Sequence, residues 1–452
     1  MSAPAGNPLS PPRRAVVVGL GRTGMSCARY LRARGVEVAI TDSRAEPPEL
    51  KNLGLLSASV TLRLGGFDPR LLDGADQIVV SPGVSLREPI VREAQARGLE
   101  VIGDIEVFAR AARAPVIAIT GTNGKSTVTT LVALMGERSG RTVRAGGNLG
   151  EPALDLLVGP MPDYYVLELS SFQLETTYSL ELRAATVLNL TPDHMDRYDT
   201  IEQYAAAKAR IFARCTHAVV NLDDAAVMRM PLPGQHVIGF SVVIDRDCDY
   251  GLVRDAGGRL SLARGRQPLL ALTEMKLTGL HNAANALAAL ALGDAAGFDL
   301  AAMLAVLRDF EGLPHRMQWV ADRSGVRWIN DSKGTNVGAT LAAVSGMQGP
   351  LVVIAGGDGK GQDFGPLADA FDRKVRRAVL IGRDAQHVAA AIRKVCDVEF
   401  AGDMPDAVTR AARAARPGDT VLLSPACASL DMFRDYTHRG AEFAAAVRDL
   451  GP

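Results

Sequence analysis

Two glycine-rich loops, each placed directly after an apolar strand-like run, constrain the fold of this chain more than any other feature. The first is GLGRTG at residues 19–24, after the apolar residues 15–18. The second is TGTNGKST at residues 120–127, between an apolar strand-like run and a helix-like segment. A glycine-rich turn at this place lets backbone N–H groups approach phosphate oxygens at a helix N-terminus. The pattern predicts two successive α/β units, each with a candidate phosphate-binding loop.

Strand-like and helix-like segments alternate along almost the whole chain, which predicts α/β layers with mostly parallel sheets. The length of 452 residues is more than one ordinary core accommodates. We therefore predict three α/β domains, over residues 1–103, 104–312 and 313–452. Between residues 237 and 272 the helical pattern gives way to short alternating strands, which predicts an antiparallel edge of the middle sheet. Strands are predicted at residues 14–18, 36–41, 60–64, 77–80, 115–120, 164–169, 186–190, 326–329, 351–355, 378–381 and 420–423.

The composition excludes several classes of partner. Lys and Arg together number 50, as do Asp and Glu, so no net charge favours nucleic acid or an anionic membrane. The apolar run at residues 283–293 is too short to span a membrane and predicts a buried helix. The five cysteines are scattered without C-x-x-C spacing, which argues against a disulfide framework or zinc site and favours the cytoplasm. We predict a monomer, with a disordered leader before Arg13.

The first glycine-rich loop allows more than one interpretation. Asp42 ends the next strand-like run about twenty residues further on, where a ribose-binding acid belongs in a dinucleotide site. By itself, the loop is compatible with a nicotinamide or flavin enzyme. It is also compatible with a tight strand-to-helix turn that holds no ligand.

The second loop is the stronger signal for a nucleotide. Lys125 can reach terminal phosphates, and Ser126 or Thr127 can ligate Mg²⁺. Ile119 stands where the strict P-loop pattern has its first glycine, so this loop is a shorter variant. Glu168 ends another apolar run, which predicts an acid on the same Mg²⁺. The alternative for Glu168 is an acid that accepts backbone hydrogen bonds at a strand end.

Further polar loops follow later strands. The segment NLTPDHMDRY brings Asp193 and His194 into one turn, which fits a metal or substrate site as well as a capping turn. Lys208, taken alone, is typical of a solvated lysine. In the last block, residues 328–340, 354–364 and 422–433 contain lysines and hydroxyl groups in strand-to-helix loops. Together these loops predict a face suited to a ligand with carboxylates.

These motifs together resemble the Mur ligases, the ATP-dependent amide-forming enzymes of peptidoglycan precursor synthesis. The resemblance extends from Arg13 to the C-terminus. Within the family, the sequence is most similar to the branch that adds D-glutamate to UDP-N-acetylmuramoyl-L-alanine. It is carried by GLGRTG, SPG (81–83), GDIE (103–106), TGTNGKST, GGN (146–148), LELSSFQLE, DHMDRY, AAK (206–208), LPHR (313–316), NDSKGTN, GGDGK and SPACASLD.

The resemblance implies a Rossmann-like N-terminal domain for the uridine nucleotide and a central P-loop ATPase-like domain for ATP. A Rossmann-like C-terminal domain would complete the ATP and glutamate sites. The implied reaction passes through an acyl phosphate in the cytoplasm and uses two Mg²⁺, with Lys208 as a carbamate. A carbamate requires a neutral amine, which a desolvated site favours.

The resemblance also implies a role for each matching residue. The implied catalytic residues are Lys125, Glu168, His194 and Lys208, and the implied metal ligands are Ser126, Glu168, His194 and carbamylated Lys208. The implied ATP contacts are Gly121, Thr122, Asn123, Gly124, Lys125, Ser126, Thr127, Asn285, Arg316 and Asp331. The implied contacts to the uridine substrate are Gly21, Arg22, Thr23, Asp42, Ser43, Arg44, Ser81, Gly83, Asn148 and His194. The implied glutamate contacts are Lys333, Thr335, Lys360, Ser429 and Tyr436.

Arg22 and Tyr436 depart from the aliphatic residue and the phenylalanine that the family often has there. Three alternatives to the ligase stay open from the residues alone: a nucleotide-dependent oxidoreductase, an ATPase or regulatory module without ligase activity, and a sibling ligase that adds another amino acid, L-glutamate included. Phosphate release from ATP that requires both UDP-N-acetylmuramoyl-L-alanine and glutamate would distinguish the ligase from these alternatives.

Overall fold

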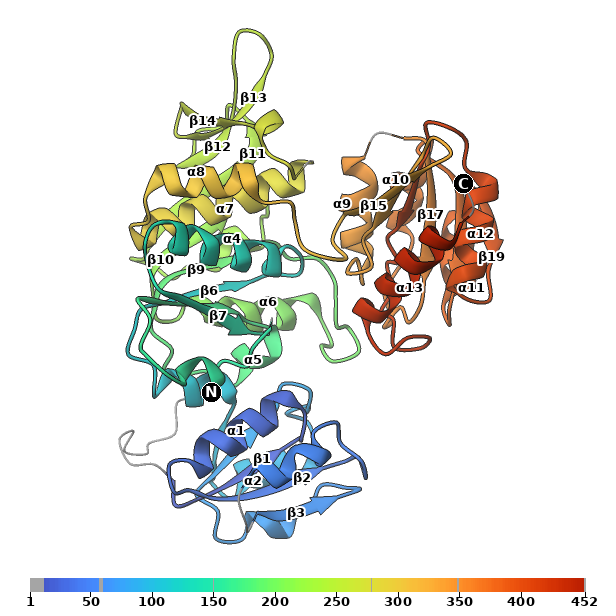
Figure 1. Cartoon of the computed structure of the whole chain (residues 1–452). Helices are drawn as coiled ribbons and strands as arrows, with labels where there is room; N and C mark the ends of the chain where they lie inside the picture. Colours follow the sequence, from blue (N-terminus) through green and yellow to red (C-terminus); the bar gives the residue numbers. More distant parts are fainter. Residues whose placement is uncertain (1–11, 57–59, 149, 278, 348, 451–452) are drawn as a thin grey trace.

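A computed structural model gives the structure of residues 12–56, 60–148, 150–277, 279–347 and 349–450. Its strands form three mostly parallel sheets of five, nine and six strands. Figure 1 shows three α/β units, with the N-terminal unit at the bottom, the central unit above it and the C-terminal unit to one side. The predicted three-domain α/β fold is confirmed. Residues 1–11 of the predicted leader lie outside the described residues.

The N-terminal sheet has the strand order β3-β2-β1-β4-β5, and all its neighbours pair in parallel. The order reverses between β1 and β4, so the GLGRTG and SPG loops leave adjacent strands at the point where such sheets bind ligands. A Cβ on Gly24 would lie 1.9 Å from the Gly19 carbonyl oxygen, so only glycine lets α1 approach the strand this closely. The elements are β1 (Arg14–Val18), α1 (Arg22–Arg32), β2 (Glu37–Asp42), β3 (Thr61–Leu64), β4 (Gln77–Val80), α2 (Pro89–Ala96) and β5 (Glu100–Ile102).

The central sheet has the order β14-β13-β12-β11-β10-β9-β6-β8-β7. Its pairs are parallel from β7 to β12, and β12, β13 and β14 pair antiparallel. The predicted antiparallel edge at residues 237–272 is therefore confirmed for β12 to β14, but β11 in the same range pairs in parallel. The strands are β6 (Val116–Thr120), β7 (Val143–Gly147), β8 (Tyr164–Glu168), β9 (Leu182–Val187), β10 (Cys215–Asn221), β11 (His236–Ile244), β12 (Tyr250–Arg254), β13 (Leu260–Arg264) and β14 (Gln267–Ala271).

The predicted strand at residues 186–190 is wrong in its bounds, because β9 ends at Val187. After this point the chain turns towards the glycine-rich loop, where the Asn189 carbonyl accepts from the Thr122 N–H at 3.0 Å. The apolar run near residue 283 forms a buried helix, as predicted. The helices of this domain are α3 (Asp104–Ala109), α4 (Lys125–Arg138), α5 (Ser171–Glu175), α6 (Ile201–Ala209), α7 (Leu280–Ala296) and α8 (Leu300–Asp309).

The C-terminal sheet has the order β15-β16-β20-β17-β18-β19, parallel except for the antiparallel edge pair β15–β16. Apolar clusters cover both of its faces. The elements are β15 (Gln318–Arg323), β16 (Val326–Asn330), α9 (Val337–Gly346), β17 (Leu351–Gly356), α10 (Pro366–Phe371), β18 (Val375–Ile381), α11 (Ala385–Ile392), β19 (Asp397–Phe400), α12 (Met404–Ala414), β20 (Thr420–Leu423) and α13 (Tyr436–Asp449).

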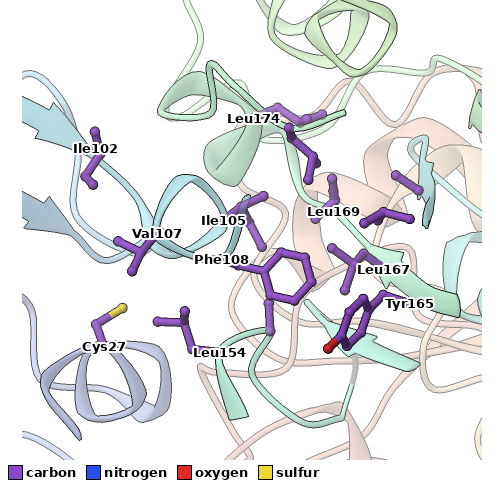
Figure 2. Packing of buried hydrophobic residues seen from close by; sticks show 14 of the residues in the cluster. Cys27, Ile102, Ile105, Val107, Phe108, Leu154, Tyr165, Leu167, Leu169 and Leu174 are labelled. Atoms are coloured by element: carbon purple, nitrogen blue, oxygen red, sulfur yellow. The ribbon is translucent and has the colours of Figure 1, made fainter. Parts of the chain in front are cut away.

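One apolar cluster joins the N-terminal and central domains (Figure 2). Phe108 on α3 lies at its middle and meets the Tyr165 ring edge-on, with centroids 5.1 Å apart. Cys27 of α1 lies on one side of α3 in this cluster, and Leu154 and Leu167 of the central domain belong to the same cluster. The two domains therefore share one core. Among the described residues, no helix is both long and apolar enough to cross a membrane.

Candidate active site

The loop between β6 and α4 has the geometry of an anion-binding turn. Gly121 and Gly124 have φ angles of +145° and +85°, which favour glycine. A Cβ atom on Gly124 would lie 2.4 Å from Oδ1 of Asn285, so the loop packs directly against α7. Gly124 caps α4 without a side-chain hydrogen bond, which leaves the first helical turn suited to binding phosphate oxygens through its N–H groups.

Two lysine amines converge on this loop. Nζ of Lys125 donates to the carbonyl oxygens of Gly121 and Thr122 at 3.0 and 2.9 Å. Nζ of Lys208, from α6, donates to the same Gly121 oxygen at 2.9 Å. Lys208 is buried, so the interpretation of this residue as a solvated lysine is wrong. Burial, and then the nearby Lys125 amine, hold the pKa of Lys208 well below its usual value, which favours a neutral amine.

Glu168 ends β8 beside the loop and is the centre of a polar cluster. Its Oε2 accepts from Oγ of Ser126 and its Oε1 accepts from Nδ2 of Asn148, both at 2.6 Å. Nη2 of Arg316 donates to the same Ser126 hydroxyl at 2.5 Å. Burial by itself would raise the pKa of Glu168, but Lys125 and the two hydrogen bonds to the carboxylate lower it. Glu168 is therefore an ionised oxygen donor at neutral pH.

The turn after residue 192 adds a carboxylate and an imidazole. Oδ1 of Asp193 accepts from Nζ of Lys360 at 2.5 Å, and its Oδ2 accepts from Nδ2 of Asn336 at 3.2 Å. His194 has a φ angle of +58°, which is uncommon for a residue with a side chain. Burial lowers the pKa of His194 to about 4 despite the adjacent Asp193 carboxylate. The imidazole is therefore neutral at pH 7, the form that binds metal ions.

Polar contacts of this kind join the C-terminal domain to the central domain. Lys360 and Asn336 reach Asp193, and Nδ2 of Asn336 also donates to Oδ1 of Asn123 at 3.2 Å. Arg316 reaches Ser126 across the same junction. The two apolar clusters of the C-terminal domain consist of residues from 317 onward. The junction is therefore polar, in contrast to the shared apolar core of the other two domains.

A cavity of about 320 Å³ lies at this junction. Phe240 and Leu277 give it an apolar part, and asparagine side chains give it a polar part. The predicted residues in its lining are Asn123, Gly124, Thr127, Asn285, Arg316, Asp331 and Lys333. The lining also contains four residues that were not predicted from the sequence, Asn189, Asn221, His281 and Asn282. The spacing of Asn282 and Asn285, three residues apart on one helix face, was a usable signal.

A second cavity, of about 580 Å³, lies at the switch point of the N-terminal sheet. Asp42 is buried beside it, where it accepts from the Leu20 N–H at 2.6 Å and pairs with Arg44 at 2.7 Å. The Arg22 guanidinium donates to the Gly150 carbonyl of the central domain at 3.0 Å. His194 lies instead in the turn beside Asp193. The predicted residues in the lining are Gly21, Arg22, Thr23, Asp42, Ser43, Arg44, Ser81, Gly83 and Asn148.

Three family models match successive parts of the chain: the Mur ligase MurD-like N-terminal domain at residues 13–103, the Mur ligase middle domain at residues 119–293, and the Mur ligase glutamate ligase domain at residues 315–427. The UDP-N-acetylmuramoylalanine–D-glutamate ligase of Nitrosococcus oceani is 51% identical over 437 residues, covering 96% of each chain. This chain belongs to the Mur ligase family. The enzyme of the same name from Methylococcus capsulatus is also 51% identical, over 97% of this Mur ligase and 95% of that protein.

Solved structures at lower identity share the fold of this Mur ligase. The pseudomurein peptide ligase type C of Methanothermus fervidus has a TM-score of 0.64 at 17% identity, covering 97% of this chain and all of that one (100%). The UDP-N-acetylmuramate–alanine ligase of Thermotoga maritima has a TM-score of 0.62 at 18% identity, with the same coverage, 97% and 100%. These likenesses support the three-domain architecture.

In this Mur ligase, the predicted glutamate residues lie on loops of the C-terminal domain, except Tyr436, which is the first residue of α13. Nζ of Lys333 lies 3.9 Å from the ring centroid of Tyr436. Thr335 follows Lys333 in the loop after β16, and Ser429 is buried in the loop after β20. Lys360 instead extends to Asp193. Burial lowers the pKa of Lys333 to about 8, so its amine stays mostly protonated at neutral pH.

Arg439 on α13 holds these loops together, and no sequence motif predicted this role. Its side chain is fully buried. It donates to the carbonyl oxygen of Ser332 at 2.8 Å and to that of Cys427 at 3.1 Å. The first contact supports the loop of Lys333 and the second supports the loop of Ser429. In the sequence, Arg439 is one arginine on an amphipathic helix, and no local pattern distinguishes it from an exposed one.

The burial of the Asp331 carboxyl group predicts that the stability of the folded protein depends on pH. Burial raises its pKa to about 7, so the folded protein keeps a proton that the unfolded chain releases at lower pH. The free energy of unfolding of the wild type therefore falls as the pH rises from the ordinary pKa of an aspartate towards 7. Asp331→Asn removes the titration; its Oδ1 can still accept from the Met317 N–H, and its amide N–H, like the O–H of a protonated carboxyl, can donate to the Ser424 hydroxyl. We compare the free energy of unfolding of Asp331→Asn with that of the wild type. The difference in favour of the variant should increase by about 2 kcal/mol between pH 5.5 and pH 7.

Urea denaturation of both proteins at several pH values measures this difference. Asp322→Asn, at an exposed position in β15, is the matched control. A gain for Asp331→Asn that is the same at pH 5.5 and pH 7 would contradict the assignment of a buried, protonated Asp331.

Proposed function

We propose that this Mur ligase uses ATP to join D-glutamate to UDP-N-acetylmuramoyl-L-alanine in the cytoplasmic stage of peptidoglycan precursor synthesis. The observation that carries the proposal is the junction at Glu168, where Ser126 of the nucleotide loop and Arg316 of the C-terminal domain meet beside Asn148. Relatives at 51% identity over nearly the full length bear the name of this enzyme, which supports the choice of substrates.

We propose a division of labour that follows the three sheets. Residues 1–103 would hold the uridine nucleotide in the larger cavity, and residues 104–312 would hold the ATP phosphates on the loop that starts at Gly121. Residues 313–452 would close the ATP cavity and bind glutamate. The enzyme would act as a monomer.

The reaction must first activate a carboxylate, because a carboxylate and an amine do not condense in water at neutral pH. Transfer of the γ-phosphoryl group from ATP to the alanyl carboxylate gives an acyl phosphate and ADP. The glutamate amine then attacks the carbonyl carbon, a C–N bond forms, the amine loses a proton, and phosphate leaves. The protein contributes positioning and charge neutralisation, as is usual for phosphoryl transfer.

The Lys125 amine would serve the first step. It lies at the loop that would cradle the phosphates, and its contacts there are neutral carbonyl oxygens. A phosphate oxygen can replace these carbonyls and gives a stronger hydrogen bond, because donor and acceptor then carry opposite charges. Arg316 already lies 2.5 Å from Ser126 and would neutralise charge from the opposite side.

The residues present fit Mg²⁺. Glu168 is ionised and Ser126 is hydrogen-bonded to it, and carboxylate and hydroxyl oxygens are the ligands that Mg²⁺ prefers. In the described part of the chain, no three His, Cys, Asp or Glu side chains gather into a metal-binding group. A carbamate on the neutral amine of Lys208 would supply the missing anionic oxygens, with His194 as a neutral ligand. When bound, two Mg²⁺ would neutralise the charge of the reacting phosphate and carboxylate.

The glutamate carboxylates would pair with lysines of the C-terminal domain. Lys333 is mostly protonated and lies over the Tyr436 ring, whose face attracts a cation. Lys360 would exchange its partner Asp193 for a glutamate carboxylate. Ser429 and Thr335 would add hydroxyl hydrogen bonds.

The proposed activity predicts phosphate release from ATP that requires both UDP-N-acetylmuramoyl-L-alanine and D-glutamate. Omission of either substrate should reduce the rate to background. L-glutamate should support a rate lower by at least about a hundredfold, because a mirror-image ligand leaves buried polar partners unpaired. Equal rates with the two enantiomers, or release without the uridine substrate, would rule the proposal out.

The proposed carbamate predicts a signal in the ¹³C NMR spectrum of enzyme equilibrated with ¹³C-bicarbonate. The signal should be absent from Lys208→Ala, and phosphate release by that variant should fall by at least about a hundredfold, since a metal ligand is lost. Lys394→Ala changes an exposed lysine on the C-terminal domain and is the control. A carbamate signal that persists in Lys208→Ala would place the modification elsewhere.

A further inference from the structure

Arg197 joins the turn of His194 to a binding turn of the N-terminal domain. Its Nη1 donates to the Pro82 carbonyl at 2.7 Å and its Nη2 donates to the Val84 carbonyl at 3.1 Å. Pro82, Gly83 and Val84 all line the 580 Å³ cavity. On its other side, the same turn is fixed by Ser81, whose Oγ donates to the Gly19 carbonyl at 2.8 Å. The turn is therefore held between the first glycine-rich loop and Arg197.

Arg197 is also connected to His194 in two ways, one direct and one through the ring of Phe172. The N–H of Arg197 donates to the carbonyl oxygen of His194 at 2.9 Å. The Arg197 guanidinium carbon lies 3.9 Å from the ring centroid of Phe172, and that ring meets the His194 imidazole edge-on with centroids 4.9 Å apart. One side chain thus touches the cavity turn and the aromatic ring against which the imidazole packs.

The contacts of Arg197 match the shape of a guanidinium. The two carbonyl oxygens accept from different nitrogen atoms, a Glu175 oxygen lies 3.3 Å from Nη2, and the flat face stacks on Phe172. The side chain is 14% exposed, so the guanidinium depends mainly on these protein contacts and little on water for its hydrogen bonds. A lysine offers neither the planar fork nor the stacking face. The turn 81–84 and the turn 193–197 are therefore constrained to move together.

We propose that Arg197 is a positioning residue that couples occupation of the uridine-nucleotide cavity to the placement of the His194 imidazole. A ligand that contacts the turn 81–84 changes the position of the carbonyls to which Arg197 donates. Arg197 transmits the change to Phe172 and through this ring to His194. The inference rests on the proposed function in one respect, since that function assigns this cavity to the uridine diphosphate part of the substrate.

Arg87 provides a matched control. It pairs with Asp199 at 2.5 Å and so bridges the same two segments. Both side chains of this pair are more than half exposed, at 54% and 61%, and exposed ion pairs contribute little to stability. Arg87→Met therefore removes a surface bridge between the segments and leaves the Arg197–Phe172–His194 contacts in place.

The test uses the full-length enzyme labelled with ¹³C and ¹⁵N in histidine, with the His194 signals assigned from the spectrum of His194→Gln. UDP alone is added, because it places a ligand in the N-terminal cavity without the reacting carboxylate. In the wild type and in Arg87→Met, UDP should shift the His194 imidazole signals. In Arg197→Met, UDP should bind about three- to tenfold more weakly, the loss expected for one ordinary hydrogen bond, because the turn 81–84 loses its anchor. At saturation, UDP should leave the His194 signals of this variant unshifted.

The rates give a second readout. Arg197→Met should lower kcat for phosphate release by about tenfold or more, as expected when a reacting group is misplaced. Arg197→Lys should recover part of the UDP affinity, through one ammonium donor, and little of kcat, because it cannot stack on Phe172. Arg87→Met should retain both values.

Each outcome decides the inference. A wild-type enzyme in which bound UDP leaves His194 unshifted would overturn it. So would an Arg197→Met enzyme with the wild-type shift and kcat. If Arg197→Met does not fold, Arg197→Lys carries the same comparison, and full kcat in that variant counts against the coupling. Failure of the wild type to release phosphate with both substrates would instead refute the proposed function, whatever the His194 spectrum shows.

Discussion

Buried charge at the carboxyl edge of the central sheet is the constraint on which the rest of the structure depends. Glu168 and Asp193 are buried there beside the neutral amine of Lys208, and an isolated charge in such a place would cost several kcal/mol. They are tolerated because each has polar partners from distant parts of the chain, such as Asn148 for Glu168 and Lys360 for Asp193. The same requirement brings three loops and two domains to one point. A site that needs all its partners for stability is also preorganised for reaction.

The two domain junctions differ in kind, and the difference matters for function. The N-terminal and central domains share one apolar core around Phe108, so separation of these domains would expose apolar surface. The C-terminal domain is joined to the central domain by polar pairs such as Lys360 with Asp193, which a charged ligand can replace. This arrangement favours movement of the C-terminal domain while the other two move as one body. Its closure over the site would keep water away from an acyl phosphate.

The sequence predicted the parts of the site that follow directly from strand and loop order. Lys125 and Glu168 come at the ends of neighbouring parallel strands, and such ends meet at one sheet edge, so their proximity was predictable. The partners of Arg197 and Arg439 were not, because each side chain contacts loops that lie far away in the sequence or in another domain. The burial of Lys208 was equally hidden from the residues alone, since the small residues around it on α6 fit a solvated helix as well. Only the family resemblance implied a desolvated amine there. Strand bounds were wrong where a loop contact ended the strand early, as for β9.

The proposed reaction requires that the alanyl carboxylate itself receives the phosphoryl group, so that one carboxylate oxygen later leaves with the phosphate. The most direct test supplies UDP-N-acetylmuramoyl-L-alanine with ¹⁸O in both oxygens of the alanyl carboxylate, together with D-glutamate, ATP and Mg²⁺. The ³¹P NMR spectrum of the released phosphate reports its ¹⁸O content. An acyl phosphate predicts one ¹⁸O atom in each phosphate molecule released. Phosphate without ¹⁸O would show that water, and not the carboxylate, accepts the phosphoryl group, and would contradict an acyl-phosphate intermediate.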